Sequence, residues 1–421
     1  MQEKEVVEQI LKYVKTIDFT DTERTKVSLF ETTIRYIAGL LSAYDLLQEP
    51  GLAYLASSSS VNALLKQAIT LTDTLTYTFQ QSKTGIPHND LYPHNQTDNG
   101  LETNGLATTG SLILEWARLS DITGDKTYVD LTAKAQSYLV KPEPASAEPF
   151  PGLTGTRINI ETGKFEDARG GWGASTDSFY EYLIKMYVYD PVHYGAYKDR
   201  WVLAADSSMQ YLASHPSSNP DVHFLSSYTG NRTVPVSSHL ACFAGGNFLL
   251  GGSVLKRQDY INFGLNLTAG CHSTYQSMKS KIGPASWSWD QGSSTDTASG
   301  PKLDIRISNA GYDLRPEVIE SYYYAHRITG DQQYRDWAWE AFVAINDTCR
   351  TEYGFSAISD VRRSDGGNMK DTTESFLFAE VFKYAYLIHT EDDVWQVNSK
   401  KGNQYVFNTE AHPLKVMGTP I

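Results

Sequence analysis

Three acidic residues stand where an apolar segment of helical period begins: Glu31, Asp177 and Glu317. A carboxylate in the first turn of a helix faces the positive end of the helix dipole, so each of them taken singly suits a structural role. Taken together they suggest chemistry, because a glycosidic bond is hydrolysed by one acid that protonates the leaving oxygen and one base that acts on water. The three positions alone leave both interpretations open.

Two arginines accompany these carboxylates. Arg35 follows the first of them by one helical turn, and Arg315 precedes the last by two residues. If the acidic segments are helices that point the same way in a ring, their N-terminal ends meet at one mouth, and these groups would form a polar pocket there. Glu181 and Glu320 lie one turn further into two of the segments and are interpreted as structural or supporting residues.

Another candidate site lies near the C-terminus, in the stretch Tyr405–Pro413. Apolar and polar residues alternate on both sides of Asn408-Thr409-Glu410, which predicts two short strands joined by a tight bend. A bend that offers a hydroxyl, a backbone carbonyl and a carboxylate close together carries the hard oxygen ligands that Ca²⁺ takes. Asn-Thr-Glu is also ordinary turn chemistry, so a capping turn without a metal is the alternative.

Helical periodicity dominates the rest of the chain. Amphipathic segments are predicted at 4–16, 28–46, 60–80, 106–122, 127–140, 174–189, 195–214, 238–252, 256–279, 315–329, 332–347 and 371–388. Two short runs in the loops, 157–160 and 302–307, are predicted to be small strands. No proline-rich linker divides the chain, so we expect residues 1–421 to form one all-α domain.

A weak internal repeat suggests how these segments are connected. Leu119–Tyr128 and His326–Tyr334 both place a glycine at a helix C-terminus and an aspartate at the start of the next helix. Repeated helical hairpins build either an open solenoid or a closed (α/α) barrel, and long polar loops favour a barrel with a site at one end. The segments that start near 28, 106, 174, 238, 315 and 371 are more apolar and richer in Gly and Ala, which suits an inner ring.

The composition limits the possible partners. The chain has 421 residues, a net charge of −13 and a pI near 5.2, so we expect neither nucleic acid nor an anionic membrane surface to bind it. Its 27 Tyr and 8 Trp are numerous enough to offer rings to sugars as well as to fill a core. No apolar run is long enough to span a membrane.

Cysteines and glycosylation sequons point towards the secretory pathway. Cys242 and Cys271 flank a predicted helix–turn–helix and could be bridged, which would leave Cys349 over. Four sequons begin at Asn95, Asn231, Asn266 and Asn346. The charged start after Met1 is not typical of a signal peptide, so we expect the targeting segment to be missing from this chain.

Five separated stretches resemble the signatures of one enzyme family. They are Phe30–Arg35 with Gly39–Tyr44, Asp177–Leu183, Leu314–Glu317, Glu374–Phe376 with Glu380 and Lys383-Tyr384, and Phe407–Pro413. In this order they resemble the class I α-1,2-mannosidases, glycoside hydrolase family 47, and the likeness runs from about Val6 to Pro413. The resemblance implies an (α/α)7 barrel of helical hairpins with a C-terminal β-hairpin that plugs one end.

The resemblance also implies a reaction, the Ca²⁺-dependent and inverting hydrolysis of terminal α-1,2-linked mannose on high-mannose N-glycans by a monomeric enzyme. It makes Glu317 the general base and puts Glu31 or Asp177 on the acid side, with the carboxyl groups about 6.5–9.5 Å apart. Thr409 would be the only direct protein ligand of Ca²⁺, and Cys242 and Cys271 occupy the family's disulfide position. Residues that would contact the terminal mannose or hold waters on the ion are Arg35, His239, Arg315, Phe376, Glu380 and Glu410.

Two substitutions depart from the family pattern. Ser175 replaces the arginine of the endoplasmic reticulum branch, which suggests the broader trimming of the fungal or Golgi-like branch. Ala285 stands where the family usually has glutamate, so a non-catalytic or weakly active glycan-binding protein on the same scaffold is the alternative function. A purely structural α-solenoid is a third possibility, which the acids at matching segment ends disfavour.

The family's first helical hairpin has no counterpart before the segment 4–16, so we expect a barrel that is incomplete at its N-terminus. The two inner segments next to the missing hairpin, 28–46 and 371–388, would then expose apolar side chains to a gap or to water. The side chains concerned are Ile34, Ile37, Leu41, Phe378, Val381, Tyr384 and Ala385. The enzyme itself is expected in the lumen of the endoplasmic reticulum or Golgi, or outside the cell.

Overall fold

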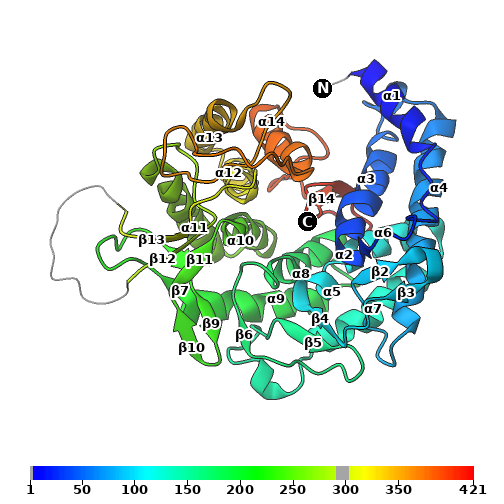
Figure 1. Ribbon diagram of the computed structural model, residues 1–421, viewed down its shortest axis with the longest axis horizontal. Coiled ribbons are helices and arrows are strands. Elements are labelled where there is room, and N and C mark those ends of the chain that lie inside the picture. The colour runs from blue at the N-terminus through cyan, green and yellow to red at the C-terminus, as the bar shows by residue number, and fades with distance from the viewer. Residues whose placement is uncertain (1–2, 291–302) are drawn as a thin grey trace.

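The computed structural model describes residues 3–290 and 303–421 as two concentric rings of helices around a short β-hairpin (Figure 1). The inner ring consists of α2 (Leu29–Glu31) with η1 (Thr32–Ile37) and α3 (Ala38–Leu46), α5 (Leu106–Gly110) with α6 (Ile113–Thr123), α8 (Asp177–Tyr189), η7 (Leu240–Cys242) with α10 (Phe243–Leu255), α12 (Glu317–Thr329), and η8 (Leu377–Phe382) with α14 (Lys383–His389). The outer ring consists of α1 (Lys4–Val14), α4 (Ser58–Leu75), α7 (Thr127–Leu139), α9 (Gly195–Ser207), α11 (Gln258–Ser277) and α13 (Gln333–Cys349). Inner and outer helices alternate along the chain, as the predicted segments require.

Short elements occupy the loops and the helix ends. The brief helices are η2 (Ala53–Leu55), η3 (Thr76–Gln80), η4 (Pro93–Asn95), η5 (Ala145–Ala147) and η6 (Ser208–Leu212). The strands pair as β1 (Val27–Ser28) with β2 (Asp90–Tyr92) and β3 (Thr97–Asp98); β4 (Thr103–Gly105) with β5 (Arg157–Asn159); β6 (Arg169–Gly170) with β9 (Ser227–Thr229) and β10 (Arg232–Val234); β7 (Ala213–Ser214) with β8 (Phe224–Leu225); and β11 (Val236–Ser238) with β12 (Ser286–Ser288) and β13 (Arg306–Asn309). β5 confirms the strand predicted at 157–160.

Burial separates the two rings. In α12 every residue from Glu317 to Ala325 is buried, and in α8 only two of the thirteen residues, Asp177 and Tyr187, are not. The outer helix α13 buries a single face, which includes Tyr334, Ala338 and Ile345. An inner helix is covered on several sides by its neighbours, whereas an outer helix is amphipathic, so the assignment of apolar segments to the inner ring is confirmed.

Glycines let α10 lie closer to its neighbours than a larger residue would allow. A Cβ on Gly251 would stand 2.2 Å from the ring of Trp201 on α9, and one on Gly245 would stand 2.5 Å from Oγ1 of Thr268 on α11. Trp201 is fixed there because its Nε1 donates a hydrogen bond to Oδ1 of Asn247 at 2.8 Å. The glycine content of this segment therefore serves the packing of the ring.

The internal repeat corresponds to two equivalent corners. Gly124 follows α6 and Gly330 follows α12, and both have a φ of +77°, the left-handed conformation that glycine supplies at a helix C-terminus. The side chains of Asp125 and Asp331 each accept a hydrogen bond at 2.9 Å from the backbone N–H two residues further on. The prediction that these are equivalent helical hairpins is confirmed.

Two inner segments become helical at least three residues later than the sequence pattern predicts. The segment predicted from residue 174 becomes helical only at Asp177, because Ser175 adopts a φ of +78° and its carbonyl accepts a hydrogen bond from the N–H of Ala107 at 3.0 Å. The segment predicted from residue 371 becomes helical only at Leu377, because the preceding residues form a loop that is hydrogen-bonded to another loop. Both errors arise from tertiary contacts that a local pattern does not contain.

The strand predicted at 302–307 is displaced towards the C-terminus. β13 starts at Arg306 and pairs with β12 across the Trp287–Ile307 position. Lys302, the first residue of the predicted run, lies outside the described residues.

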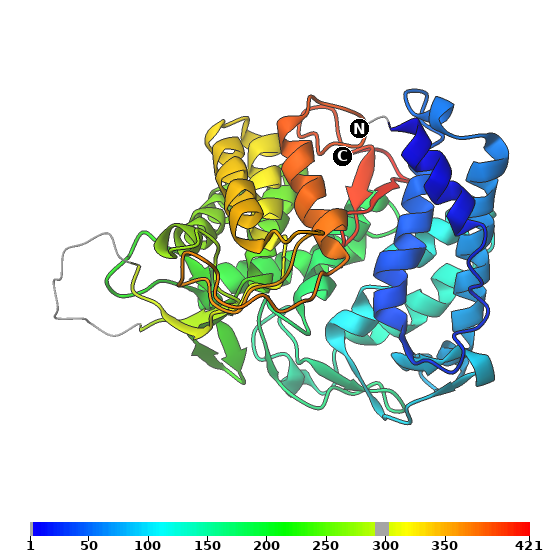
Figure 2. The ribbon, with the colours of Figure 1, turned by 45° about the horizontal axis from the view of Figure 1, so that its top comes forward.

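The C-terminal hairpin stands inside the ring. β14 (Tyr405–Phe407) pairs antiparallel with β15 (Pro413–Lys415), and Figure 2 shows both strands (red) between α14 (orange) and α3 (blue). All of β14 is buried. The N–H of Lys415 donates to Oδ2 of Asp45 on α3 at 2.9 Å, which ties the hairpin to the inner ring. The predicted bend between two short strands is confirmed.

The predicted exposure of the two inner segments is mostly wrong. Of the seven side chains named, only Phe378 is exposed, at 62%, and the other six are buried. The hairpin provides part of their cover, because the ring of Phe407 lies 5.9 Å from that of Tyr384 and Nδ2 of Asn408 donates to the carbonyl of Ile34 at 2.9 Å. Exposed rings do occur on both segments, but apart from Phe378 they are residues that were not predicted, such as Tyr36.

The cysteine prediction is confirmed. Cys242 and Cys271 form a disulfide between η7 and α11, and Cys349 is a buried free thiol. None of the helices in the described part of the chain is both long enough and apolar enough to cross a membrane.

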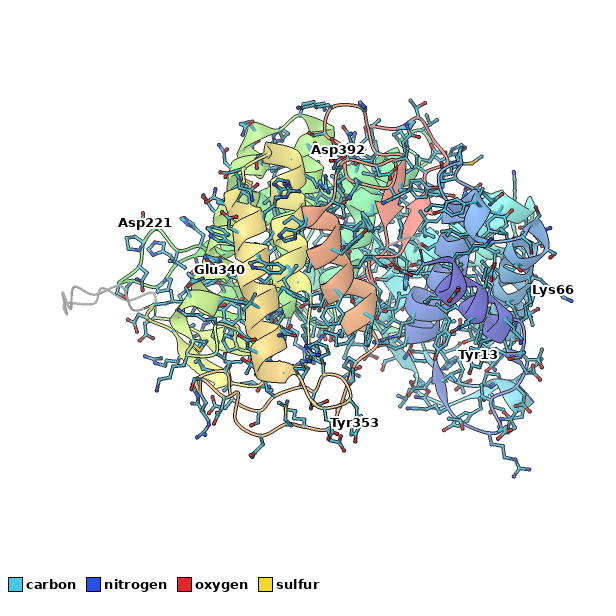
Figure 3. The ribbon with its side chains drawn as sticks, turned by 90° about the horizontal axis from the view of Figure 1, so that it is seen from above. Tyr13, Lys66, Asp221, Glu340, Tyr353 and Asp392 are labelled. Carbon is cyan, nitrogen blue, oxygen red and sulfur yellow. A yellow bond between two sulfur atoms is a disulfide. The ribbon has the colours of Figure 1, made fainter. Side chains whose placement is uncertain are left out.

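The inner helices all start at the same end of the ring. Tyr353, just after the C-terminus of α13, and Asp392, just after the C-terminus of α14, lie at opposite ends in Figure 3. The outer helix α13 and the inner helix α14 therefore run in opposite directions, and residues from the first turns of all inner segments line one cavity. The three acidic residues that open such segments are brought to this cavity.

Candidate active site

A cavity of about 320 Å³ opens at the N-terminal ends of the inner helices. Every inner segment contributes to its wall, and so does the bend of the C-terminal hairpin. The polar residues that line it are Glu31, Arg35, Thr108, Ser175, Asp177, Ser178, Glu181, Arg315, Glu317, Glu320, Glu380, Thr409 and Glu410. The structure therefore gathers Glu31, Asp177 and Glu317 around one space, together with both arginines.

Glu317 is the first residue of α12 and is 8% exposed. Its Oε2 lies 2.7 Å from Nδ1 of His239, and its Oε1 lies 3.9 Å from Nη1 of Arg315. Burial alone raises the pKa of this carboxyl, but the hydrogen bond from His239, the charge that His239 carries when it is protonated and the charge of Arg315 outweigh it, so the net pKa is lowered. Glu317 is thus held as a carboxylate, the form that a general base requires.

Asp177 is likewise the first residue of its helix, α8, but the pKa of its carboxyl is shifted in the opposite direction. Its Oδ1 accepts a hydrogen bond from the N–H of Ser178 at 2.9 Å. Burial, assisted by repulsion from Glu181 and Glu317, raises the pKa of Asp177 to about 7. When the pKa values of two carboxyls are shifted in opposite directions, one carboxyl holds a proton while the other is ionised.

Glu31 is held by an arginine that bridges two parts of the wall. Nε of Arg35 lies 2.8 Å from Oε2 of Glu31 and 3.1 Å from Oε1 of Glu410, and its Nη1 donates to Oγ of Ser375 at 2.6 Å. The guanidinium groups of Arg35 and Arg315 stand 5.5 and 5.6 Å from the ring of Phe376. An aromatic ring between two fixed donors offers one apolar surface and several hydrogen bonds to a polar ligand.

Further carboxyls line the cavity beneath these groups. Burial, followed by repulsion from neighbouring glutamates, raises the pKa of Glu320 and Glu380 well above the ordinary value. Glu181 forms a buried ion pair with Lys185. Glu181 and Glu320 had been interpreted as structural or supporting residues, yet both line the cavity. Glu181 follows Asp177 by four residues and Glu320 follows Glu317 by three, so each pair lies on one helix face. This spacing was the sequence signal that Glu181 and Glu320 face the same cavity.

The bend that carries Thr409 is fixed by its neighbour Asn408. Oδ1 of Asn408 accepts from the N–H groups of Glu410 and His412 at 3.0 and 2.9 Å. Its Nδ2 donates to Oε1 of Glu115 at 2.8 Å, and Glu115 is completely buried on α6. Glu115 was not predicted from the sequence, because no turn or cap signal distinguishes it from an ordinary helical glutamate.

The donor set around Thr409 fits a hard cation. The hydroxyl and carbonyl of threonine are oxygen ligands of the kind that Ca²⁺ takes, and Thr409 lines the cavity among carboxyls that repel one another. Within residues 3–290 and 303–421, no three His, Cys, Asp or Glu side chains form a group that could hold a metal by themselves. The arrangement is compatible with one threonine ligand and bound waters, which is the coordination expected from the sequence.

His239 lies next to Glu317 rather than on the cavity wall. It is 1% exposed, absent from the cavity wall, and lies behind Glu317. A direct contact with the terminal sugar is therefore not supported, because the side chain reaches the cavity only through the carboxyl of Glu317. The role that the resemblance implies for His239, a contact with the terminal mannose or with waters on the ion, stays a prediction.

Known proteins resemble this chain over nearly its whole length. The family model described as "Glycosyl hydrolase family 47" matches residues 1–416. The Aspergillus phoenicis protein named "Mannosyl-oligosaccharide alpha-1,2-mannosidase 1B" is 55% identical over 100% of this chain and 82% of its own length. The Penicillium citrinum "Mannosyl-oligosaccharide alpha-1,2-mannosidase" is 55% identical over 99% of this chain and 81% of its own length. The solved "alpha-1,2-mannosidase from Trichoderma reesei" superposes with a TM-score of 0.94 at 46% identity, covering 99% of this chain and 87% of that one.

Proposed function

The chain belongs to glycosyl hydrolase family 47, and we propose that it removes terminal α-1,2-linked mannose from high-mannose N-glycans. The observation that carries this proposal is the pair of carboxyls at one cavity, Glu317 with a lowered pKa and Asp177 with a pKa raised to about 7. The relatives that are 55% identical are named for this activity. The sequon residues Asn95, Asn231 and Asn266 are exposed, and with the disulfide they further support a place in the secretory pathway or outside the cell.

The mechanism that we infer is inversion. Glu317 accepts a proton from water as that water attacks the anomeric carbon, and the acid side gives a proton to the leaving oxygen. Asp177 retains its proton up to about pH 7, where Glu317 is already ionised, so both groups are in their working states in the same pH range. Glu31, paired with Arg35, completes the acid side and orients the leaving group or a water that relays the proton.

The cavity walls suit a single sugar ring. Arg35, Arg315 and Glu410 offer hydrogen bonds to hydroxyl groups, and Phe376 offers a ring to an apolar sugar face. We propose that Ca²⁺ is held by Thr409 and by waters that Glu317, Glu380 and Glu410 position. When bound, the ion supplies a fixed positive charge that offsets the mutual repulsion of these carboxyls.

The alternative of a non-catalytic glycan-binding protein rests on Ala285 and on the missing first hairpin. The backbone of Ala285 pairs with Gly311 and with His239, at 3.0 Å in both cases, and its side chain does not line the cavity. The carboxyls that the reaction needs are all supplied by other residues, so the structure favours catalysis over binding alone.

The purified protein is expected to release free mannose from a high-mannose glycan. It should leave α-1,3- and α-1,6-linked mannobiosides intact, should lose activity in a chelator, and should recover it with added Ca²⁺. Free mannose can be quantified enzymatically and the shortened glycans by mass spectrometry. Retained glycan binding without any mannose release would favour the non-catalytic alternative instead.

A further inference from the structure

Three buried side chains from three separate segments of the chain form a line that leads away from the cavity. Oε2 of Glu317 on α12 lies 2.7 Å from Nδ1 of His239, and Nε2 of the same imidazole lies 2.8 Å from the hydroxyl of Tyr275 on α11. His239 and Tyr275 are 1% and 2% exposed. Neither ring is on the cavity wall that Glu317 lines, so neither is in a position to touch the sugar.

The chemistry of the three groups determines which of them donates. An ionised carboxylate only accepts, so Nδ1 of His239 must carry the proton that faces Glu317. In its neutral form the imidazole has a single N–H, which leaves Nε2 as an acceptor, and it is this neutral form that the proposal concerns. The hydroxyl of Tyr275 must then donate to Nε2, and in doing so it selects the tautomer that serves Glu317.

The surroundings hold Tyr275 in this position. A Cβ on Gly283 would stand 2.7 Å from ring carbons of Tyr275, so a glycine is required beside the ring. The disulfide joins Cys242, three residues after His239, to Cys271, one helical turn before Tyr275. The segment that carries the acceptor and the helix that carries the donor are thus covalently connected next to the hydrogen bond.

We propose that Tyr275 is a positioning residue for the catalytic base. By donating to Nε2 it fixes the ring orientation and the Nδ1–H tautomer of His239, and through His239 it keeps the carboxylate of Glu317 ionised and aimed at the cavity. This inference rests on the proposed role of Glu317 as the general base. It gives the buried Tyr–His pair a function in turnover rather than in packing alone.

The proposal predicts a specific defect for Tyr275→Phe. Without the donor, His239 is free to take the Nε2–H tautomer, which turns a lone pair towards Glu317 and raises the pKa of that carboxyl. The base then titrates at higher pH, so the acidic limb of the kcat profile moves upwards. We expect kcat to fall by about 10- to 100-fold, as for other residues that orient a reacting group, with KM changed by less than about twofold because the cavity wall is intact.

Other groups face Glu317 and must remain unchanged for this interpretation. They are Arg315 on its own segment, Asp177 and Glu181 on α8, Glu320 on α12, Glu380 on η8, Glu410 on the bend, and Tyr312, whose ring lies 5.7 Å from that of His239. Tyr312 also forms a side-chain hydrogen bond with the hydroxyl of Tyr275, and all of these groups are retained in the variant.

Tyr322→Phe is the matched control. Tyr322 is a buried tyrosine whose hydroxyl lies 2.8 Å from Nδ1 of His272, so it forms the same kind of pair on the outer side of the ring. Both variants lose one hydroxyl, and similar thermal unfolding temperatures would show similar structural costs. Only Tyr275→Phe should shift the acidic limb. If both variants keep the wild-type kcat and the wild-type limb, the proposal is overturned.

A spectroscopic measurement tests the positioning without relying on turnover. In protein labelled with ¹⁵N-histidine, the imidazole signals that disappear in His239→Gln identify His239. The wild type should show the Nδ1–H tautomer, and Tyr275→Phe should show the other tautomer or an average. An unchanged tautomer contradicts the proposal even if mannose release is normal, whereas an inactive wild type with the expected tautomer contradicts only the proposed function.

Discussion

Glu317→Gln is expected to lower kcat for mannose release by about 10²- to 10⁴-fold, the range that a general base contributes. The amide has the size of the carboxylate and its oxygen can still accept the hydrogen bond from His239, so the local packing is preserved. It has no basic oxygen to take a proton from the attacking water. The loss should therefore appear in kcat, measured from initial rates on a high-mannose glycan, while glycan binding by calorimetry remains.

Glu340→Gln is the matched control for this change. Glu340 lies on α13 in the outer ring (Figure 3), is exposed, and accepts a hydrogen bond from Gln276. The same substitution there should leave turnover unchanged. If Glu317→Gln retained more than about a tenth of the wild-type kcat, Glu317 would not be the general base.

Thr409→Ala is expected to lower Ca²⁺ affinity and activity together. The hydroxyl that would bind the ion is removed, while Asn408 still fixes the bend through the N–H groups of Glu410 and His412. We expect affinity to fall by at least about tenfold, since even residues that only support a metal ligand contribute 10- to 100-fold. Calorimetric titration with Ca²⁺ measures the affinity, and mannose release at several Ca²⁺ concentrations measures the activity.

Thr409→Ser provides the control, because it keeps the hydroxyl and loses only a methyl group. It should bind Ca²⁺ and turn over substrate much more nearly like the wild type than the alanine variant does. Unchanged Ca²⁺ binding in Thr409→Ala would show that the ion binds elsewhere, whatever happens to activity.

Much of the architecture could be predicted from local patterns. Apolar periodicity and the glycine–aspartate corners at Gly124 and Gly330 are local features, and they are what the structure shows. The start of α8 was missed by three residues because the backbone of Ser175 is held by Ala107, a contact across 68 positions of sequence, 175 − 107. Periodicity records which side of a segment is apolar, and it does not record such a contact.

The residues of the candidate site also fall into two groups, those that a local pattern reveals and those that depend on distant contacts. Glu31, Asp177 and Glu317 were found because each stands at the start of an inner segment, and a common helix direction brings such positions to one end. Glu115 and Tyr275 were missed because their roles depend on hydrogen bonds to Asn408 and His239, which come from distant parts of the chain. The local sequence around a buried glutamate or tyrosine in a helix does not tell whether the side chain positions a reacting group or only packs in the core.

The predicted exposure of the inner faces failed for a related reason. Removing one hairpin from a ring was expected to leave apolar side chains in water, but the C-terminal hairpin packs against Tyr384 and holds the carbonyl of Ile34. The cover of these two inner segments thus depends partly on an element that the family resemblance placed only as a plug at one end.

The stereochemistry of the first product tests the account most directly. Proton NMR spectra recorded immediately after enzyme is added to a high-mannose glycan show the anomeric signal of released mannose before mutarotation. A base at Glu317 that acts on water, opposite an acid side formed by Asp177 and Glu31, predicts β-mannose first and α-mannose only later. Initial release of α-mannose would contradict the assignment of Glu317 and the inverting mechanism built on it.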